Sequence, residues 1–263
     1  MWAGPGAPKF RRDTRPAIGK LSLPVNLILF DPAETSVPLP RRDPRAAHLL
    51  DVLRRREGDT FAAGLIDGPR GKGTVVAIGA AALVLGFAWG EPPPPPDPIT
   101  VLVGLPRPQT ARDILRDATA LGVAALHFVL TEKGDPGYAQ STLWSSGEWR
   151  RHLVTGAQQA FTTRLPAVTH GRRLAEALAT LPSGGTRLAL DNYEAPARLS
   201  QCHLIDDTSV VLALGAERGW AAAERALLRA HQFTFAHLGL NVLRTETACT
   251  AAVTLIKAKL GSL

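Results

Sequence analysis

The sequence predicts an α/β protein in which a small, mostly β domain precedes a larger domain with a largely parallel sheet. After residue 98, short apolar runs alternate with helical patterns, as in repeated strand–helix units. Before residue 91, four short apolar runs surround a single helical segment. Five consecutive prolines at 92–96 separate the two parts, because they cannot continue a helix or an inner strand. We therefore expect domains at 25–90 and 99–263, joined by a linker at 91–98.

The composition is that of a globular protein, with 263 residues, 45% hydrophobic and 20% charged. Two cysteines, Cys202 and Cys249, can neither build a disulfide framework nor fill a four-ligand zinc site alone. No apolar run reaches membrane-spanning length, and the first twenty residues lack the apolar stretch of a secretory signal. We expect a cytoplasmic protein with no membrane partner.

The net charge of +7 indicates a polyanionic partner, and its distribution is uneven. Residues 1–24 hold five basic residues and one acidic residue, a net charge of +4. This Pro/Gly-rich extension is predicted to be disordered. It either attaches to RNA or only keeps the protein in solution, and composition favours neither.

In the first domain, strands are predicted at 27–30, 60–66, 74–78 and 83–88. Ala46, Leu49, Leu50 and Leu53 recur at helix spacing, and the turn residues of 67–73 indicate a hairpin loop. Local positive clusters predict contacts with RNA phosphates, with a plain solvated face as the alternative. The residues assigned to RNA are Arg41, Arg42 and Arg54, with Arg45, Arg55 and Arg56 in the same clusters.

In the second domain, strands are expected at 99–105, 126–130, 187–190, 210–214 and 233–235. Helices are expected over 111–121, in a segment ending near residue 161, and over 220–231 and 245–260, with a further segment at 172–181. Ligands of such sheets gather at the carboxyl ends of the strands. Residues 104–106, 191–193 and 215–219 should therefore converge.

Several common chemistries are excluded. The stretch 68–74 resembles a P-loop, but Ile66 occupies the first glycine position of that motif and Gly73 follows Lys72, so it is interpreted as a turn. No GxGxxG follows a strand, which argues against a dinucleotide site and the commoner open-sheet methyltransferases. GxSxG and HExxH are absent, and the histidines lack metal-ligand spacing. His127 and His237 are interpreted as core or boundary residues.

One informative stretch is Val210-Val-Leu-Ala-Leu-Gly-Ala-Glu-Arg-Gly-Trp220, a buried strand leading into a glycine-bounded loop and then a helix. Gly215 and Gly219 would let backbone amides approach a ligand, and the helix N-terminus favours an anionic group. Taken alone, this pattern is better explained as an ordinary turn between a strand and a helix.

A second stretch, His237-Leu-Gly-Leu-Asn-Val-Leu-Arg-Thr-Glu-Thr-Ala248, follows about twenty residues later. Together the two resemble the signatures of the RsmE-type ribosomal RNA methyltransferases, a Gly-Pro-Glu-Gly-Gly loop and a Leu-Gly-x-Arg-Ile-Leu-Arg-Thr-Glu-Thr-Ala segment. The stretch 48–54 with Gly58 and Asp59 resembles that family's amino domain. Further matches are Leu121-Gly-Val123, Thr131-Glu132, Gln159 and Pro166. The resemblance spans residues 25–261.

The resemblance implies a SPOUT-type α/β domain with a C-terminal trefoil knot, preceded by a PUA-like β domain that binds RNA. A knot is a rare exception to ordinary chain topology. The implied cofactor is S-adenosylmethionine, bent within the knot and held largely by backbone groups. The residues that would bind it are Leu190, Leu214, Gly215, Ala216, Glu217, Gly219, Leu238, Gly239, Val242, Leu243, Thr245 and Thr247.

The implied reaction is methylation of uridine N3 in 16S ribosomal RNA of the small ribosomal subunit. N3 loses a weakly acidic proton, so a cation would stabilise the developing uridine anion. Arg244 is the candidate for that role or for gripping a phosphate, and Glu246 would orient Arg244 or interact with the helix dipole. Alternatively, Thr245 caps the helix while Arg244 and Glu246 form a structural ion pair.

The resemblance also implies a homodimer formed through the C-terminal domain. The last helix carries small and apolar residues on one stripe, namely Ala248, Ala251, Ala252, Leu255 and Ile256. Intramolecular packing of this stripe is the simpler alternative.

The likeness departs from the family pattern at Ala216, Arg218, Asn241, Gln158, Thr162 and Ala120. Two other hypotheses therefore stay open. One is a diverged SPOUT methyltransferase that modifies another RNA site, and the other is an inactive RNA-binding protein with this fold.

Overall fold

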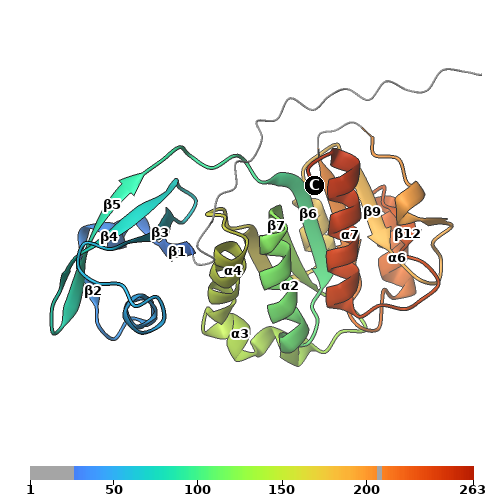
Figure 1. The fold of residues 1–263 in the computed structure, drawn as a ribbon. Helices are drawn as coiled ribbons and strands as arrows, with labels where there is room; N and C mark the ends of the chain where they lie inside the picture. Colours follow the sequence, from blue (N-terminus) through green and yellow to red (C-terminus); the bar gives the residue numbers. More distant parts are fainter. Residues whose placement is uncertain (1–26, 206–208) are drawn as a thin grey trace, which may run out of the picture.

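The computed structural model describes residues 27–205 and 209–263. It contains two sheets, a five-stranded one from the amino-terminal part and a seven-stranded one from the remainder (Figure 1). The predicted basic extension 1–24 lies outside the described residues. Within them, no helix combines the length and hydropathy that crossing a bilayer requires.

The amino-terminal sheet has the order β1-β3-β4-β5-β2. Its strands are β1 (Leu27–Phe30), β2 (Leu39–Pro40), β3 (Thr60–Leu65), β4 (Arg70–Ile78) and β5 (Ala82–Trp89). Between β2 and β3 the chain forms α1 (Pro44–Ala47) and the π-helical turn η2 (His48–Val52), which follow the single-turn helix η1 (Pro32–Ser36). Ala46 and Leu49 of the helical segment are buried with Phe30, Phe61 and Leu83 in one small core. The sheet and its one helical region fit the PUA-like domain that the resemblance implied.

The predicted loop 67–73 is shorter in the structure, because β4 already begins at Arg70. Gly71 and Gly73 therefore lie in a strand and not in a turn. A Cβ on Gly73 would lie 2.2 Å from the Phe61 ring, and one on Gly71 would lie 2.1 Å from the Ala88 carbonyl oxygen. Close packing, not turn geometry, explains these two glycines.

The larger sheet has the order β10-β12-β9-β11-β6-β7-β8, and all of its recorded strand pairs are parallel. Its strands are β6 (Asp97–Gly104), β7 (Val123–Leu130), β8 (Ala167–Arg173), β9 (Thr186–Leu190), β10 (Ala197–Arg198), β11 (Val210–Leu214) and β12 (Thr234–His237). The edge strand β8 has no apolar run, and the segment expected at 172–181 begins inside it. An edge strand needs less apolar surface than an inner strand, which is why β8 gave no signal.

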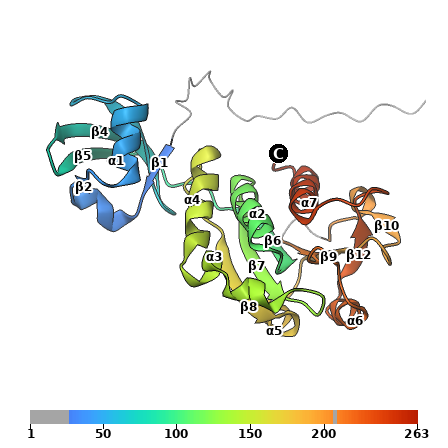
Figure 2. The ribbon, with the colours of Figure 1, turned by 90° about the horizontal axis from the view of Figure 1, so that it is seen from below.

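Helices cover both faces of this sheet (Figure 2). On one face lie α2 (Pro108–Ala120), α3 (Thr142–Ser145), α4 (Glu148–Gln159) and α7 (Thr245–Leu260). On the other lie α5 (Leu174–Ala179) and α6 (Ala222–Ala230). Two short 3-10 helices, η3 (Pro136–Gln140) and η4 (Leu199–Gln201), complete the elements. Each face buries its own hydrophobic cluster against the Val- and Leu-rich inner strands.

The two parts of the molecule are in contact through β1 and α4. Leu27 and Leu29 pack with Ala157 of α4, and Arg150 of α4 forms an ion pair with Asp31 at 2.8 Å. The guanidinium of Arg164 donates to the carbonyl oxygens of Pro93 and Pro94, so the proline-rich connection is held against the larger part.

The Glu148 side chain on α4 forms an ion pair with α2, and this pair makes the stability of the folded protein depend on pH. Its carboxylate accepts from Arg112 at 3.0 Å and lies 3.1 Å from His152, and these partners lower the pKa of Glu148 from 4.5 to about 2. The ionised form is favoured in the folded state, so its contribution to folding stability is present above about pH 4.5 and lost as the pH falls towards 2.

We expect Glu148→Gln to reduce the loss of unfolding free energy between pH 5 and 3, measured by urea unfolding. Glu91→Gln, in the exposed linker, serves as the control; an equal reduction there would contradict the assignment.

Candidate functional site

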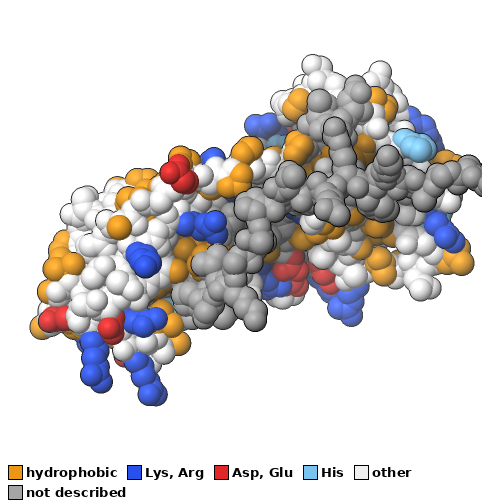
Figure 3. Space-filling view, turned by 45° about the horizontal axis from the view of Figure 1, so that its top comes forward, with side chains coloured by type: hydrophobic (Ala, Val, Ile, Leu, Met, Phe, Trp, Pro, Cys, Tyr) orange, Lys and Arg blue, Asp and Glu red, His pale blue; other side chains and the backbone are white. Residues whose placement is uncertain are grey.

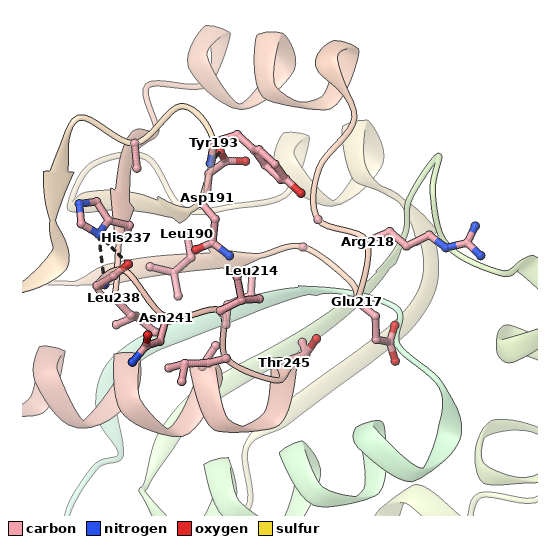
Figure 4. A pocket seen from close by; sticks show the side chains of 18 of the residues that line it. Leu190, Asp191, Tyr193, Leu214, Glu217, Arg218, His237, Leu238, Asn241 and Thr245 are labelled. Atoms are coloured by element: carbon pink, nitrogen blue, oxygen red, sulfur yellow. Dashed lines mark hydrogen bonds between the residues drawn. The ribbon is translucent and has the colours of Figure 1, made fainter.

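Three chain segments surround a pocket of about 480 Å³ at the carboxyl edge of the parallel sheet (Figure 4). They are residues 190–195 after β9, 214–219 after β11 and 237–248 after β12. Because β12, β9 and β11 are adjacent parallel strands, their carboxyl ends open at the same edge. Residues far apart in sequence thereby share one cavity.

The loop 214–219 is tightly folded. A Cβ on Gly215 would lie 2.7 Å from the Cα of Gly219, and Gly219 adopts a φ of 65°, where glycine is favoured. The loop also rests on β6, since a Cβ on Gly104 would lie 2.5 Å from the Ala216 nitrogen. The backbone of this loop therefore approaches its neighbours closely and can present backbone groups to a ligand.

Trp220 ties this loop to the neighbouring strand. Its side chain is fully buried, and its indole N–H donates to the Leu190 carbonyl oxygen at 3.2 Å. Glu224 in turn accepts from the backbone N–H groups of Ala221 and Glu132, each at 2.8 Å, which joins the start of α6 to the segment after β7. These hydrogen bonds hold the glycine loop and the start of α6 against the neighbouring segments.

The third segment forms the wall nearest α7. The backbone N–H of Gly239 donates to Nδ1 of His237 at 3.1 Å, which closes a small turn (Figure 4). Further along, Leu240 is 93% exposed and Val242 is 79% exposed. Thr245 and Ala248, on the first turns of α7, line the pocket. Two large apolar side chains thus stand exposed at the rim of the pocket.

Two charged residues of the glycine loop, Glu217 and Arg218, belong to the pocket lining. The Glu217 carboxylate accepts from the backbone N–H of Arg107 at 3.0 Å, and the Arg218 side chain points away from the cavity (Figure 4). The rest of the lining from this loop is apolar side chain and backbone, which suits a flat apolar group with polar ends.

Of the twelve residues expected to bind the cofactor, eleven line this pocket, and Thr247, which is exposed on α7, does not. The expected convergence of 191–193 with 215–219 is also seen. Gly104 packs against the backbone of the glycine loop, but residues 104–106, which were expected to converge there as well, do not line the cavity. Asp191 and Tyr193, which were expected at this edge but not assigned to the cofactor, also line the pocket. His237, interpreted from the sequence as a core or boundary residue, lines it as well, and its position at the end of β12 is the signal that could have identified it.

Arg244 and Glu246 flank the pocket without lining it. Arg244 is the N-cap residue of α7, its side chain is exposed, and it makes no capping hydrogen bond. Glu246 lies in the first turn of the helix, where a carboxylate interacts favourably with the helix dipole. The helix begins at Thr245, so Thr245 is not the N-cap residue that the structural alternative required.

The amino-terminal arginines fall into two groups. Arg41, Arg42 and Arg54 are exposed, and Figure 3 shows Lys and Arg side chains projecting from this part of the molecule. Arg45, by contrast, is held by Glu34 at 2.7 Å and Asp43 at 2.8 Å and lies over the Phe30 ring. The charge of Arg45 is thus already paired with two carboxylates, which separates it from the three exposed arginines.

Comparison with known proteins gives a consistent result. A family model described as RNA methyltransferase domain matches residues 93–257. The ribosomal RNA small subunit methyltransferase E of Treponema pallidum is 33% identical over 247 residues, covering 89% of this chain and 91% of that protein. The crystal structure of the Neisseria gonorrhoeae enzyme of the same name, bound to S-adenosyl methionine, has a TM-score of 0.71 at 23% identity, covering 89% of this chain and 97% of that chain. A probable rRNA-methyltransferase from Porphyromonas gingivalis has a TM-score of 0.75 at 18% identity, with coverage of 89% and 98%.

Proposed function

The chain belongs to the RsmE-type family of ribosomal RNA small-subunit methyltransferases, and from this premise we propose that it methylates N3 of a uridine in 16S ribosomal RNA. S-adenosylmethionine is the methyl donor of this family's reaction. The observation that carries the proposal is the pocket itself, in which the two family-like segments, 214–219 and 237–248, face each other. That the substrate is ribosomal RNA of the small subunit follows from family membership. That the methylated atom is N3 of a uridine is our proposal.

The pocket residues fit the cofactor. Leu190, Leu214 and Leu238 provide apolar wall for an adenine ring, and the tight loop at Gly215 supplies backbone groups for its polar edge. The cavity of about 480 Å³ lies in the usual range for small-molecule sites. Bound there, S-adenosylmethionine would supply an electrophilic methyl group on a positively charged sulfur. The shared pocket of segments 214–219 and 237–248 also supports the knotted path that the resemblance implies and that we propose here.

Arg244 is proposed to act on the substrate beside this pocket. Its neighbours Leu243 and Thr245 line the cavity, and no carboxylate in the described residues pairs with its exposed guanidinium. A free cation at this place can stabilise negative charge that develops on the uracil ring as N3 loses its proton. Glu246, two residues on, is proposed to bias the guanidinium orientation from the first turn of α7.

The departures from the family pattern leave the pocket intact, which favours an active enzyme over an RNA-binding protein without activity. Ala216 is a buried residue of the loop itself, and the Arg218 side chain is directed outward (Figure 4). Asn241 is exposed at the rim. Arg218 and Asn241 therefore alter surface that RNA would meet, while Ala216 still lines the pocket.

The function is tested by methyl transfer from labelled S-adenosylmethionine to small ribosomal subunits from cells that lack the native enzyme. We expect one methyl group per 16S RNA, located on uridine N3 by nuclease digestion and mass spectrometry. Label on another base would support the diverged-enzyme alternative. Cofactor binding without transfer to any RNA would support the inactive alternative.

Cofactor binding is expected to depend on the glycine loop. In Gly215→Ala, the added methyl would lie 2.7 Å from the Gly219 Cα, so the loop must open and its backbone groups move. We expect cofactor affinity measured by calorimetry to fall at least tenfold, the size of about one hydrogen bond to a charged group. Gly86→Ala, in the amino-terminal sheet, is the control for a glycine substitution remote from the pocket. Unchanged affinity in Gly215→Ala would remove the loop from the site.

A homodimer formed through the carboxyl-terminal part is proposed as well. The support is the exposed apolar surface of Leu240 and Val242, next to the start of α7. Covering these side chains with a second subunit would remove them from water, a gain of about 25 cal/mol per Å² of apolar area. We expect Leu240→Asp together with Val242→Asp to halve the mass measured by light scattering. The matched control is Val52→Asp, an exposed valine of the amino-terminal part, and an unchanged mass in the double variant would contradict the interface.

A further inference from the structure

Tyr193 is an exposed aromatic side chain at the rim of the pocket. It is 80% exposed, although an aromatic ring of this size is ordinarily at least half buried. It lines the cavity from the β9 side, opposite the beginning of α7 (Figure 4). An exposed ring that borders a binding pocket is available to a ligand that approaches from outside.

The backbone of Tyr193 is anchored by hydrogen bonds, although its ring is exposed. One carboxylate oxygen of Asp191 accepts from the backbone N–H groups of Tyr193 and Glu194, each at 2.7 Å. The other carboxylate oxygen accepts from Nε of Arg225 at 2.7 Å. The side chains of Asp191 and Arg225 are 2% and 9% exposed, so this ion pair is buried.

Arg225 also contacts the ring. Its guanidinium carbon lies 5.4 Å from the Tyr193 ring centroid, within the range of a cation–π interaction. Glu194 approaches Arg225 at 3.7 Å and forms an ion pair with Arg229, which holds the loop on α6. One side of the ring is therefore supported by the protein, while most of its surface stays open to solvent.

We propose that Tyr193 is a stacking platform for a base of the RNA substrate at the mouth of the pocket, with Asp191 and Arg225 as the residues that position it. The inference rests on the proposed function, since it assumes that RNA reaches this pocket. Exposed aromatic rings beside cationic surface are the usual means of holding an unstacked base. The enclosed leucine walls suit the cofactor, whereas this open ring suits a group delivered from solvent.

The experiment compares Tyr193→Ala and Tyr193→Phe with the parent protein. Stacking on one base typically contributes about tenfold or more in affinity, so we expect Tyr193→Ala to raise KM for the small ribosomal subunit by that factor. Tyr193→Phe keeps the ring and should stay within about twofold of the parent. Cofactor affinity by calorimetry and mass by light scattering should be unchanged in both variants. Tyr193 is exposed, so neither change should unfold the protein.

Three results would overturn the proposal. An unchanged KM in Tyr193→Ala would mean that no base rests on the ring. A loss of cofactor affinity would assign the ring to the cofactor, and a halved mass would assign it to a subunit interface. Direct RNA binding, measured with a fluorescently labelled 16S fragment, separates this proposal from the reaction itself. If no variant transfers methyl groups but Tyr193→Ala still binds that fragment about tenfold more weakly, the proposed function fails and the platform stands.

Arg225→Gln tests the positioning role. It removes the cation beside the ring but keeps hydrogen-bonding capacity near Asp191, and its fold is checked by thermal unfolding. If Arg225 acts through Tyr193, KM should rise in Arg225→Gln but not rise further when Tyr193→Ala is added. Additive effects of the two changes would contradict a positioning role.

Discussion

Replacing Arg244 with alanine is expected to lower kcat by about a hundredfold or more while cofactor affinity stays near that of the parent. The guanidinium is exposed beside the pocket and does not line it, so its loss should leave the cofactor walls unchanged. An interaction made only as charge develops on the uracil lowers kcat and kcat/KM together when it is removed. Single-turnover methyl transfer with saturating cofactor and RNA measures the effect.

Arg244→Lys and Glu246→Gln complete that test. Lysine keeps the charge but loses the planar fork, so partial activity is expected. Glu246→Gln should have a smaller effect than either Arg244 change, because Glu246 is proposed to act through the arginine. If Arg244→Ala folds, binds cofactor and methylates at the parent rate, the assignment is wrong. If only RNA affinity falls, Arg244 holds a phosphate instead.

Reversing the charge of Arg41, Arg42 and Arg54 to glutamate is expected to weaken RNA binding strongly and to flatten its salt dependence. These side chains are exposed on the amino-terminal part, and each phosphate contact adds about 0.7 to 0.9 to the slope of log K against log salt. Loss of three contacts should therefore reduce that slope by about 2 to 3. Filter binding of a 16S fragment between low and physiological salt measures it.

The control for this variant is Arg198→Glu, which changes an exposed arginine on β10, at the opposite end of the larger sheet from β8. It should leave the slope nearly as it is in the parent. Arg45 is not part of the test, because its ion pairs with Glu34 and Asp43 make it a structural residue. A slope unaffected by reversal at Arg41, Arg42 and Arg54 would make them a solvated face.

Local patterns predicted the regular elements of the inner sheet well. The apolar runs at β6, β9 and β11 and the helical spacing of α7 were legible because inner strands and packed helices must be apolar on the surfaces they bury. The edge strand β8 was missed because it pairs with another strand on one side only within the described residues. It therefore carries no apolar run from which a strand could be predicted. The glycines at 71 and 73 were misread as a turn, because the groups that exclude a Cβ there come from other strands: the Ala88 carbonyl oxygen at Gly71 and the Phe61 ring at Gly73.

The candidate site divides in a similar way. Eleven of the twelve expected cofactor residues line the pocket, and all of these except Leu190 lie in two short stretches whose likeness to the family could be read directly. Thr247 does not, because a helix turns by about 100° per residue and brings Thr245 and Ala248 to the cavity instead. Arg45 was assigned to RNA by charge alone, and no local pattern shows that Glu34 and Asp43 fold against it.

The sequence alone was enough to predict most inner strands and the long helices, the family and the two segments that meet at the pocket. Those properties depend on residues close together in the chain, where periodicity and motif are visible. Tertiary structure alone decided that Asp191 and Arg225 form a buried pair and that Tyr193 stands exposed beside it. Such contacts join residues more than thirty positions apart, and their strength comes from exclusion of water and close approach, which only the folded chain provides.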